Sequence, residues 1–226
     1  VTVIGQPTVS VSTATPVICI NGLFLISSTV NNGSGLYMYQ WQTSDNETGP
    51  WTNITSNGEN PEYTDILSVT GVKYYRVIVT DLANGCGVMT SSVVSITVNP
   101  NPLVSVTPLD QIVCVGGIAT LTAQITNGSG DYSFQWEYSE DGSSWQDVAS
   151  GGNNITYNPP TGDLITYYYR VLLTDNGAGC ENPYSEPVYV LGQEQPFVDI
   201  AVDTPIIWLN GSSAISPTVT NGPGPF

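Results

Sequence analysis

The chain has four cysteines, whose thiols could form disulfides, bind a metal or act as nucleophiles: Cys19, Cys86, Cys114 and Cys180. The chain has no histidine, so a Ser–His–Asp or Cys–His catalytic arrangement would lack its base. No two cysteines are closely spaced, which disfavours a zinc site. An even number of cysteines favours disulfide bonds. We therefore expect disulfides, and we expect no metal, no cofactor and no enzyme activity.

The acidic residues do not add a catalytic pair. The chain has 19 Asp and Glu against 3 Lys and Arg, a net charge of −16. The carboxylates gather in turns and change position between the two halves of the chain, as solvated charges do. Asp81 and Asp175 recur beside loops, and calcium binding there stays open because oxygen ligands suit Ca²⁺. The charge repels phosphate backbones and anionic lipid, so we expect no nucleic-acid partner and no direct membrane insertion.

The elements that position the cysteines occur twice. Each landmark of the first copy returns 94 or 95 positions later, which is the mark of a duplicated folding unit. The corresponding pairs are Cys19 and Cys114, Cys86 and Cys180, Trp41 and Trp136, Trp51 and Trp145, Tyr75 and Tyr169, and the segments 32–35 and 127–130. We predict the last strand of a preceding repeat at 1–6, full repeats at 7–100 and 101–194, and the start of a further, incomplete repeat at 195–226. The chain would then be an internal segment of a longer protein.

Alternating apolar and polar residues predict short strands throughout each repeat, and no segment of ten or more residues has a helical period. About seven short strands in a repeat of this length are typical of an immunoglobulin-like β-sandwich. The predicted fold class is all-β, with tandem immunoglobulin-like β-sandwich domains in a linear array. Arg170 and Glu137 would face outward as a cross-strand pair. The expected core residues are Trp41, Trp136, Tyr75 and Tyr169.

Several motifs of the second copy resemble a known group of repeats. They lie at 112–117, 127–130, 134–136, 141–145, 168–175 and 179–180, and the first copy has the same series from Cys19 to Cys86. Together they are similar to the tandem Ig-like repeats of giant surface and secreted proteins of Bacteroidota, including gliding-type adhesins exported by the type IX system. The resemblance covers essentially the whole chain and implies an extracellular, cell-surface location.

Two disulfide pairings are open. Pairing within repeats would join Cys19 to Cys86 and Cys114 to Cys180. In an Ig-like sandwich the second and sixth strands run in the same direction. Cys19 comes just before the second strand and Cys86 just after the sixth, so the two would lie at opposite ends of the sandwich. That separation exceeds the Cα distance of about 7 Å that a disulfide allows. The other pairing joins Cys19 to Cys180 across repeats and leaves Cys86 and Cys114 for flanking repeats. A long loop that folds back after Asp81 would restore the first pairing.

Two functions fit these features. The first is structural: stalk repeats of a long cell-surface adhesin or filament that project a distal binding region, with neighbouring repeats of the same chain and other filament chains as partners. The second is a polysaccharide-binding or spacer module of a secreted multidomain enzyme. For that function Trp51 and Trp145, which occupy matching positions after the third strand, are the candidates for stacking on surface polysaccharide.

Six Asn-x-Ser/Thr triplets are candidate glycosylation sites. The motif is weak evidence by itself, because a chain rich in Asn, Ser and Thr produces several such triplets by composition alone. The asparagines are Asn32, Asn46, Asn53, Asn127, Asn154 and Asn210.

Overall fold

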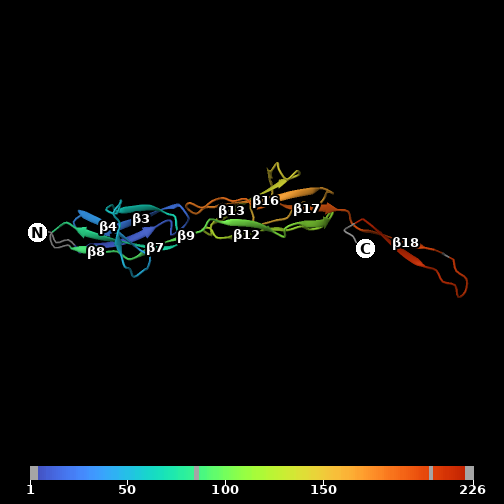
Figure 1. Ribbon diagram of the computed structural model, residues 1–226, viewed down its shortest axis with the longest axis horizontal. Helices are drawn as coiled ribbons and strands as arrows, with labels where there is room; N and C mark the ends of the chain where they lie inside the picture. The colour runs from blue at the N-terminus through green and yellow to red at the C-terminus, as the bar shows by residue number, and fades with distance from the viewer. Residues whose placement is uncertain (1–4, 84–86, 204–205, 222–226) are drawn as a thin grey trace. The chain divides into compact units, whose positions relative to one another are not determined.

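The computed structural model describes residues 5–83, 87–203 and 206–221, which form 19 strands in two compact units (Figure 1). The first unit contains residues 1–103 together with 126–132 and 174–183, and the second contains 104–125, 133–173 and 184–226. Two loops of the second repeat therefore belong with the first unit. Within the described residues, no helix has the length and apolar composition needed to cross a membrane.

The first unit is a sandwich of two sheets. One sheet has the antiparallel order β1-β3-β6, and the other has the order β2-β9-β7-β4-β5 with β8 beside β7. The bounds in the first sheet are β1 (Thr8–Thr13), β3 (Gly22–Asn31) and β6 (Glu62–Leu67). Those in the second are β2 (Val17–Cys19), β4 (Tyr37–Ser44), β5 (Thr52–Asn53), β7 (Gly71–Asp81), β8 (Val88–Thr90) and β9 (Val94–Asn99).

The first strand of this repeat divides between the two sheets, which is one reason why the repeat has more strands than the seven expected. β1 pairs with β3, whereas β2 pairs in parallel with β9, with Cys19 opposite Asn99. Pro16 lies between β1 and β2, and it has no backbone N–H to continue a ladder. Its carbonyl accepts a hydrogen bond from the Thr97 N–H at 2.9 Å. This crossing places Cys19 at the end of β2, next to the end of the repeat.

The second unit repeats the sandwich with the orders β10-β12-β15 and β11-β17-β16-β13-β14. Figure 1 shows β12 in one layer and β16 and β17 in the other. The bounds are β10 (Leu103–Thr107), β11 (Gln111–Cys114), β12 (Leu121–Thr126), β13 (Tyr132–Ser139), β14 (Gln146–Asp147), β15 (Thr156–Tyr157), β16 (Thr166–Asp175) and β17 (Val188–Gln193).

Each sandwich is built around one tryptophan. Trp41 and Trp136 are fully buried, and Tyr75 and Tyr169 are 2% exposed. A buried indole N–H needs an acceptor. Trp41 donates to the Asn60 carbonyl at 2.9 Å, and Trp136 donates to the Asn154 carbonyl at 2.8 Å. All four residues predicted for the core lie inside the sandwiches.

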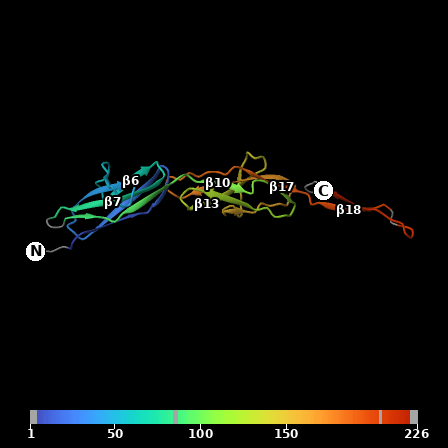
Figure 2. The same ribbon diagram turned by 60° about the horizontal axis from the view of Figure 1, so that its bottom comes forward.

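The hairpin of β18 (Phe197–Val202) and β19 (Ile215–Thr220), red in Figures 1 and 2, exposes its apolar side chains. Phe197 is 61% exposed, Ile200 62% and Trp208 92%. By repeat offset β18 and β19 correspond to β10 and β12, which bury their inner faces in the complete repeat. The described residues thus contain the opening hairpin of a sandwich without its second sheet.

Candidate functional site

The disulfide joins the two repeats. Cys19 in β2 is bonded to Cys180, with 4.8 Å between their Cα atoms and 161 residues between them in sequence. Both cysteines lie in the first unit, because the segment 174–183 belongs to it. Of the two pairings left open by the sequence, the structure has the one across repeats, so Cys180 is not bonded to Cys114. Cys86 lies outside the described residues.

Backbone contacts hold the 174–183 loop of the second repeat beside this disulfide. The Cys19 N–H donates to the Ala178 carbonyl at 3.0 Å, and Ile18 forms a bridge with Ala178. Gly22 and Gly179 lie so close that a Cβ on Gly179 would be 2.2 Å from the Gly22 Cα. The covalent bond therefore closes a surface that is already formed by hydrogen bonds and by close glycine packing.

Cys114 has the position in the second repeat that Cys19 has in the first. It ends β11, which is parallel to β17, as Cys19 ends β2, which is parallel to β9. Cys114 is partly exposed and makes no disulfide with any described residue. Its pairing with a flanking repeat stays a prediction.

A buried aspartate fastens the Asn-Gly-Ser-Gly loop of each repeat. In the second repeat Asp175, 5% exposed, accepts hydrogen bonds from the Ser129 N–H at 2.7 Å, from the Ser129 hydroxyl and from the Gly177 N–H. Asp81 makes the corresponding bonds in the first repeat with Ser34 N–H, Ser34 hydroxyl and Ala83 N–H. The sequence marked both aspartates and both loops as recurrent, but period-two patterning gave no sign that they touch.

This geometry explains why the loop contains glycine and argues against a cation. Gly128 has a φ of +82°, and a Cβ there would lie 2.4 Å from an Asp175 carboxylate oxygen. Cys19, Asp175 and Cys180 do bring ligand atoms within 4.8 Å of one another. The disulfide nevertheless occupies both sulfurs. The Asp175 carboxylate already accepts hydrogen bonds from N–H and O–H groups, and these donors point their hydrogens at the place where a cation would have to sit. We assign no metal to this group.

The two tryptophans considered for sugar stacking are partly covered by arginine. The Arg76 guanidinium lies 4.3 Å from the ring centre of Trp51, and Arg170 lies at the same distance from Trp145. Both rings are half-buried. One face of each ring is thus engaged in a cation–π contact, which leaves less of it to meet a sugar.

The predicted cross-strand pair in the second repeat is confirmed. Arg170 Nε donates to Glu137 Oε2 at 2.6 Å, and the Arg170 guanidinium also lies 4.1 Å from the ring centre of Tyr184. Glu137 is only 9% exposed. In the first repeat Arg76 donates instead to the neutral Gln42 Oε1 at 2.7 Å. The second repeat therefore contains a largely desolvated ion pair where the first has a neutral acceptor.

All six asparagines of the Asn-x-Ser/Thr triplets are exposed. Three of them have left-handed backbone with φ between 64° and 67°: Asn32, Asn127 and Asn210. Exposure makes each triplet accessible, and the structure adds nothing that selects one of them.

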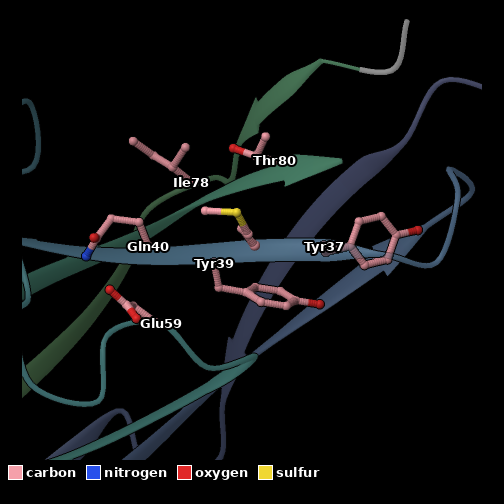
Figure 3. A pocket seen from close by; sticks show the side chains of 7 residues that line it. Tyr37, Tyr39, Gln40, Glu59, Ile78 and Thr80 are labelled. Carbon is pink, nitrogen blue, oxygen red and sulfur yellow. The ribbon is translucent and has the colours of Figure 1, made fainter. Parts of the chain in front are cut away.

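A groove of about 290 Å³ lies in the first sandwich beside β4 and β7 (Figure 3). Figure 3 shows the Tyr39 ring and the Glu59 side chain on one side of β4, and Ile78 and Thr80 on the other. Gln40 completes the polar part of the lining, although its amide N–H₂ group also donates to the Trp41 and Ile54 carbonyls at 2.9 Å. Burial, followed by the neighbouring Tyr37, raises the pKa of Tyr39, so its hydroxyl stays a neutral donor. The sequence analysis predicted none of these residues as a site. Strand patterning does not reveal that Glu59, which lies in a loop, comes close to β4.

Comparisons with solved structures are consistent with tandem Ig-like sandwiches. The three N-terminal domains of the bacteriophage RB49 Highly Immunogenic Outer Capsid protein (Hoc) are 15% identical, with a TM-score of 0.52 over 95% of this chain and 70% of that one. The N-terminal four Ig domains of Dscam1 isoform 8.4 are 13% identical, with a TM-score of 0.37 over 77% of this chain and 42% of that one. Fibronectin(III)-like modules of Clostridium thermocellum CbhA are 12% identical, with a TM-score of 0.35 over 80% of this chain and 93% of that one. At these identities the likeness to Hoc shows the fold alone, and the other two carry no argument.

No curated protein matches this chain. A family model does match it twice, over residues 8–100 and 105–193, and these matches cover most of the chain. The chain therefore belongs to the family described as domain of unknown function DUF8696, of which it contains two tandem Ig-like copies.

Proposed function

We propose that these domains are stalk repeats of a long protein on the cell surface, where they project a distal binding region. The observation that carries this proposal is the Cys19–Cys180 disulfide, which joins two copies of one folding unit. Disulfides persist in oxidising compartments outside the cell. An enzyme gains little from a covalent bond between repeats, whereas a protein that carries load along a series of repeats gains resistance to local unfolding. The partners in this proposal are neighbouring repeats and other chains of the same filament.

The proposal extends to the kind of parent protein. The motifs that resemble repeats of giant Bacteroidota proteins support a gliding-type adhesin exported by the type IX system. Tandem Ig-like domains and a strongly negative surface are compatible with that setting. The chemistry of the domains does not by itself select an organism, so this part of the proposal rests on the resemblance.

Immunogold electron microscopy of the source cells tests the stalk proposal. Antibody raised against residues 101–194 should label thin filaments at the cell surface, at several points along each. An antibody against a cytosolic protein of the same cells provides the control for access. Label found only on soluble protein shed into the medium would overturn the proposal in favour of a module of a secreted enzyme.

The groove of Figure 3 favours polysaccharide binding as a second candidate function. Tyr39, Gln40 and Glu59 place an aromatic ring beside an amide and a carboxylate. Such a combination can contact both the apolar face and the hydroxyls of a sugar. Affinity electrophoresis in gels containing neutral polysaccharides tests it. Tyr39→Ala should lose any retardation that the parent chain shows, and Trp51→Ala should keep it. Loss in Trp51→Ala alone would move the sugar site to the tryptophan.

A further inference from the structure

Both sandwiches have a cavity at corresponding places: the first lines it mainly with polar side chains around Tyr63, and the second lines it mainly with tyrosines. The cavity of the second sandwich is therefore the more aromatic of the two. Its volume is about 330 Å³, within the range of about 300–1,000 Å³ that is usual for small-molecule sites. Four tyrosines from three segments line it, with aliphatic side chains at its edge: Tyr138, Tyr157, Tyr167 and Tyr169, with Val148 and Pro160. Tyr169 is buried, and the other three tyrosines are partly exposed.

The strand that borders the cavity differs in length between the two repeats. In the first repeat β6 has six residues and pairs with β3 from Gly22 to Ser27. Its counterpart β15 has two residues and pairs only with Leu121 and Thr122. After Tyr157 the chain continues as Asn158-Pro159-Pro160, and proline has no N–H for a ladder. The β10-β12-β15 sheet therefore stops early, and Pro160, just beyond it, joins the cavity lining beside the tyrosines of β13 and β16.

The tyrosine rings form an open box. The rings of Tyr138 and Tyr167 are 6.3 Å apart and inclined by 64°. Tyr167 and Tyr169 are 6.5 Å apart at 46°, and Tyr169 and Tyr157 are 5.6 Å apart at 49°. A flat ligand such as a sugar ring would meet a flat platform better. Rings inclined to one another suit a compact, rounded group that touches several ring faces at once.

Two of these tyrosines are not required by the fold. By repeat offset Tyr138 corresponds to Thr43 and Tyr167 to Lys73 in the first repeat. Lys73 forms an ion pair there with Asp45. The first sandwich thus forms the same sheets with a threonine and a lysine at these positions. The aromatic side chains at these two positions are therefore particular to the second repeat, and they lie near the end of its short strand β15.

The charge around the cavity selects the ligand. Burial and, after it, the carboxylates of Glu140 and Asp163 raise the pKa of Tyr167, so two negative charges act on a tyrosine of the lining. No lysine or arginine lines the cavity. The whole chain has a charge of −16, so an anionic ligand would be repelled and a cation attracted.

We propose that the tyrosine cavity of the second repeat binds an organic cation with a quaternary ammonium head group. The ring faces of Tyr138, Tyr157 and Tyr167 contact the methyl groups and attract the charge, because aromatic faces carry negative electrostatic potential. The carboxylates of Glu140 and Asp163, which act on Tyr167, help to balance the charge. Choline and similar compounds are the chemical class that such a site takes.

Isothermal titration of the 226-residue chain with choline and with its neutral isostere 3,3-dimethylbutan-1-ol tests the proposal. Both probes have the same shape, so their difference measures the charge. We expect choline to bind at least tenfold more tightly than the isostere, and we expect that preference to shrink as NaCl is raised from 50 to 500 mM. Equal binding of the two probes, or no binding of choline, would overturn the proposal, as would binding of neutral oligosaccharides in place of choline.

The first repeat supplies variants that are compatible with the fold. Tyr167→Lys and Tyr138→Thr introduce the residues that the corresponding sites of the first repeat already contain. Tyr167→Lys should lower choline affinity at least tenfold, and Tyr138→Thr by about threefold or more. Tyr189→Thr, on β17 and outside the cavity lining, should leave it unchanged within about twofold. Unchanged affinity in Tyr167→Lys, with circular dichroism like that of the parent chain, would refute the assignment.

Discussion

Replacing both cysteines of the inter-repeat disulfide by alanine, as Cys19→Ala/Cys180→Ala, should destabilise the first unit. The bond spans 161 residues. If the second sandwich stays folded while the first unfolds, the bond restrains only the roughly 85 residues between Cys19 and the second repeat. For a loop of that length, loop-closure entropy gives at most about 4–5 kcal/mol, and measured values for native disulfides are about 2–5 kcal/mol. We expect a loss of about 3 kcal/mol.

Thermal denaturation followed by tryptophan fluorescence measures this loss. Trp41 lies in the core of the first sandwich and reports its unfolding. The melting temperature of the first unit should fall by about 10 °C or more. Cys114→Ala is the matched control, because Cys114 makes no disulfide within the described part of the chain. The reasoning fails if the double variant and Cys114→Ala have the same midpoint.

Tryptic digestion without reductant tests the connectivity itself. Cleavage after Lys73, Arg76 and Arg170 separates the cysteines into fragments 1–73, 77–170 and 171–226. The structure predicts that fragment 1–73 migrates with 171–226 and that both separate on reduction. A bond between 1–73 and 77–170 would show that Cys19 pairs with Cys86 or Cys114 instead, and would refute the inter-repeat disulfide.

Three further substitutions or conditions test other parts of the structure. Gly128→Ala should cost about 2–4 kcal/mol in urea unfolding, because its Cβ would meet the buried aspartate, whereas Gly130→Ala, in open space, should cost only the backbone strain of about 1 kcal/mol. Equal costs would contradict that reasoning. Arg170→Ala should cost about 3 kcal/mol because it leaves a buried glutamate unpaired, and Arg76→Ala, whose partner is neutral, about 1 kcal/mol. Raising the pH should unfold the chain, because burial raises the pKa of Tyr75 to about 12. The unfolded state then loses the tyrosine proton first, above pH 10. Between pH 10 and 12 this residue lowers the free energy of unfolding by about 1.4 kcal/mol per pH unit. Thermal melts at pH 9–12 should show the decline in the parent chain and a smaller decline in Tyr75→Phe.

Much of the fold could be predicted from the sequence because strand patterning is local. The alternation of apolar and polar residues identifies the face that each strand buries, and Trp41 and Trp136 lie where that alternation places them. The repeat offset adds long-range information, because it aligns Cys19 with Cys114 and so identifies corresponding ends of two sandwiches. Strand direction then favours the pairing across repeats by distance, although a loop that folds back after Asp81 leaves the other pairing open until the structure is known.

Contacts made by loops could not be predicted in this way. The bonds from Ser129 to Asp175 join residues 46 positions apart, and their existence depends on how two loops meet at the end of a sandwich. The assignment of 126–132 and 174–183 to the first unit has the same origin. The tyrosine lining of the second cavity has a sequence signal in Tyr138 and Tyr167, which stand where the first repeat has Thr43 and Lys73. That signal acquires meaning only when the strands that bring the two tyrosines together are known.

The differences between the two copies separate what the sandwich needs from what has been added to it. The aspartate and its Asn-Gly-Ser-Gly loop occur in both copies, and so does a cysteine at the end of the strand parallel to β9 or β17. These features lie where loops and repeats meet. The residues at 43 and 138, and at 73 and 167, differ in size, polarity and charge, although the sheets around them are the same. The loops and cysteines that link repeats can therefore stay the same while the residues that line the cavity change. Each repeat of an array built this way can acquire its own ligand without any change in how the repeats are linked.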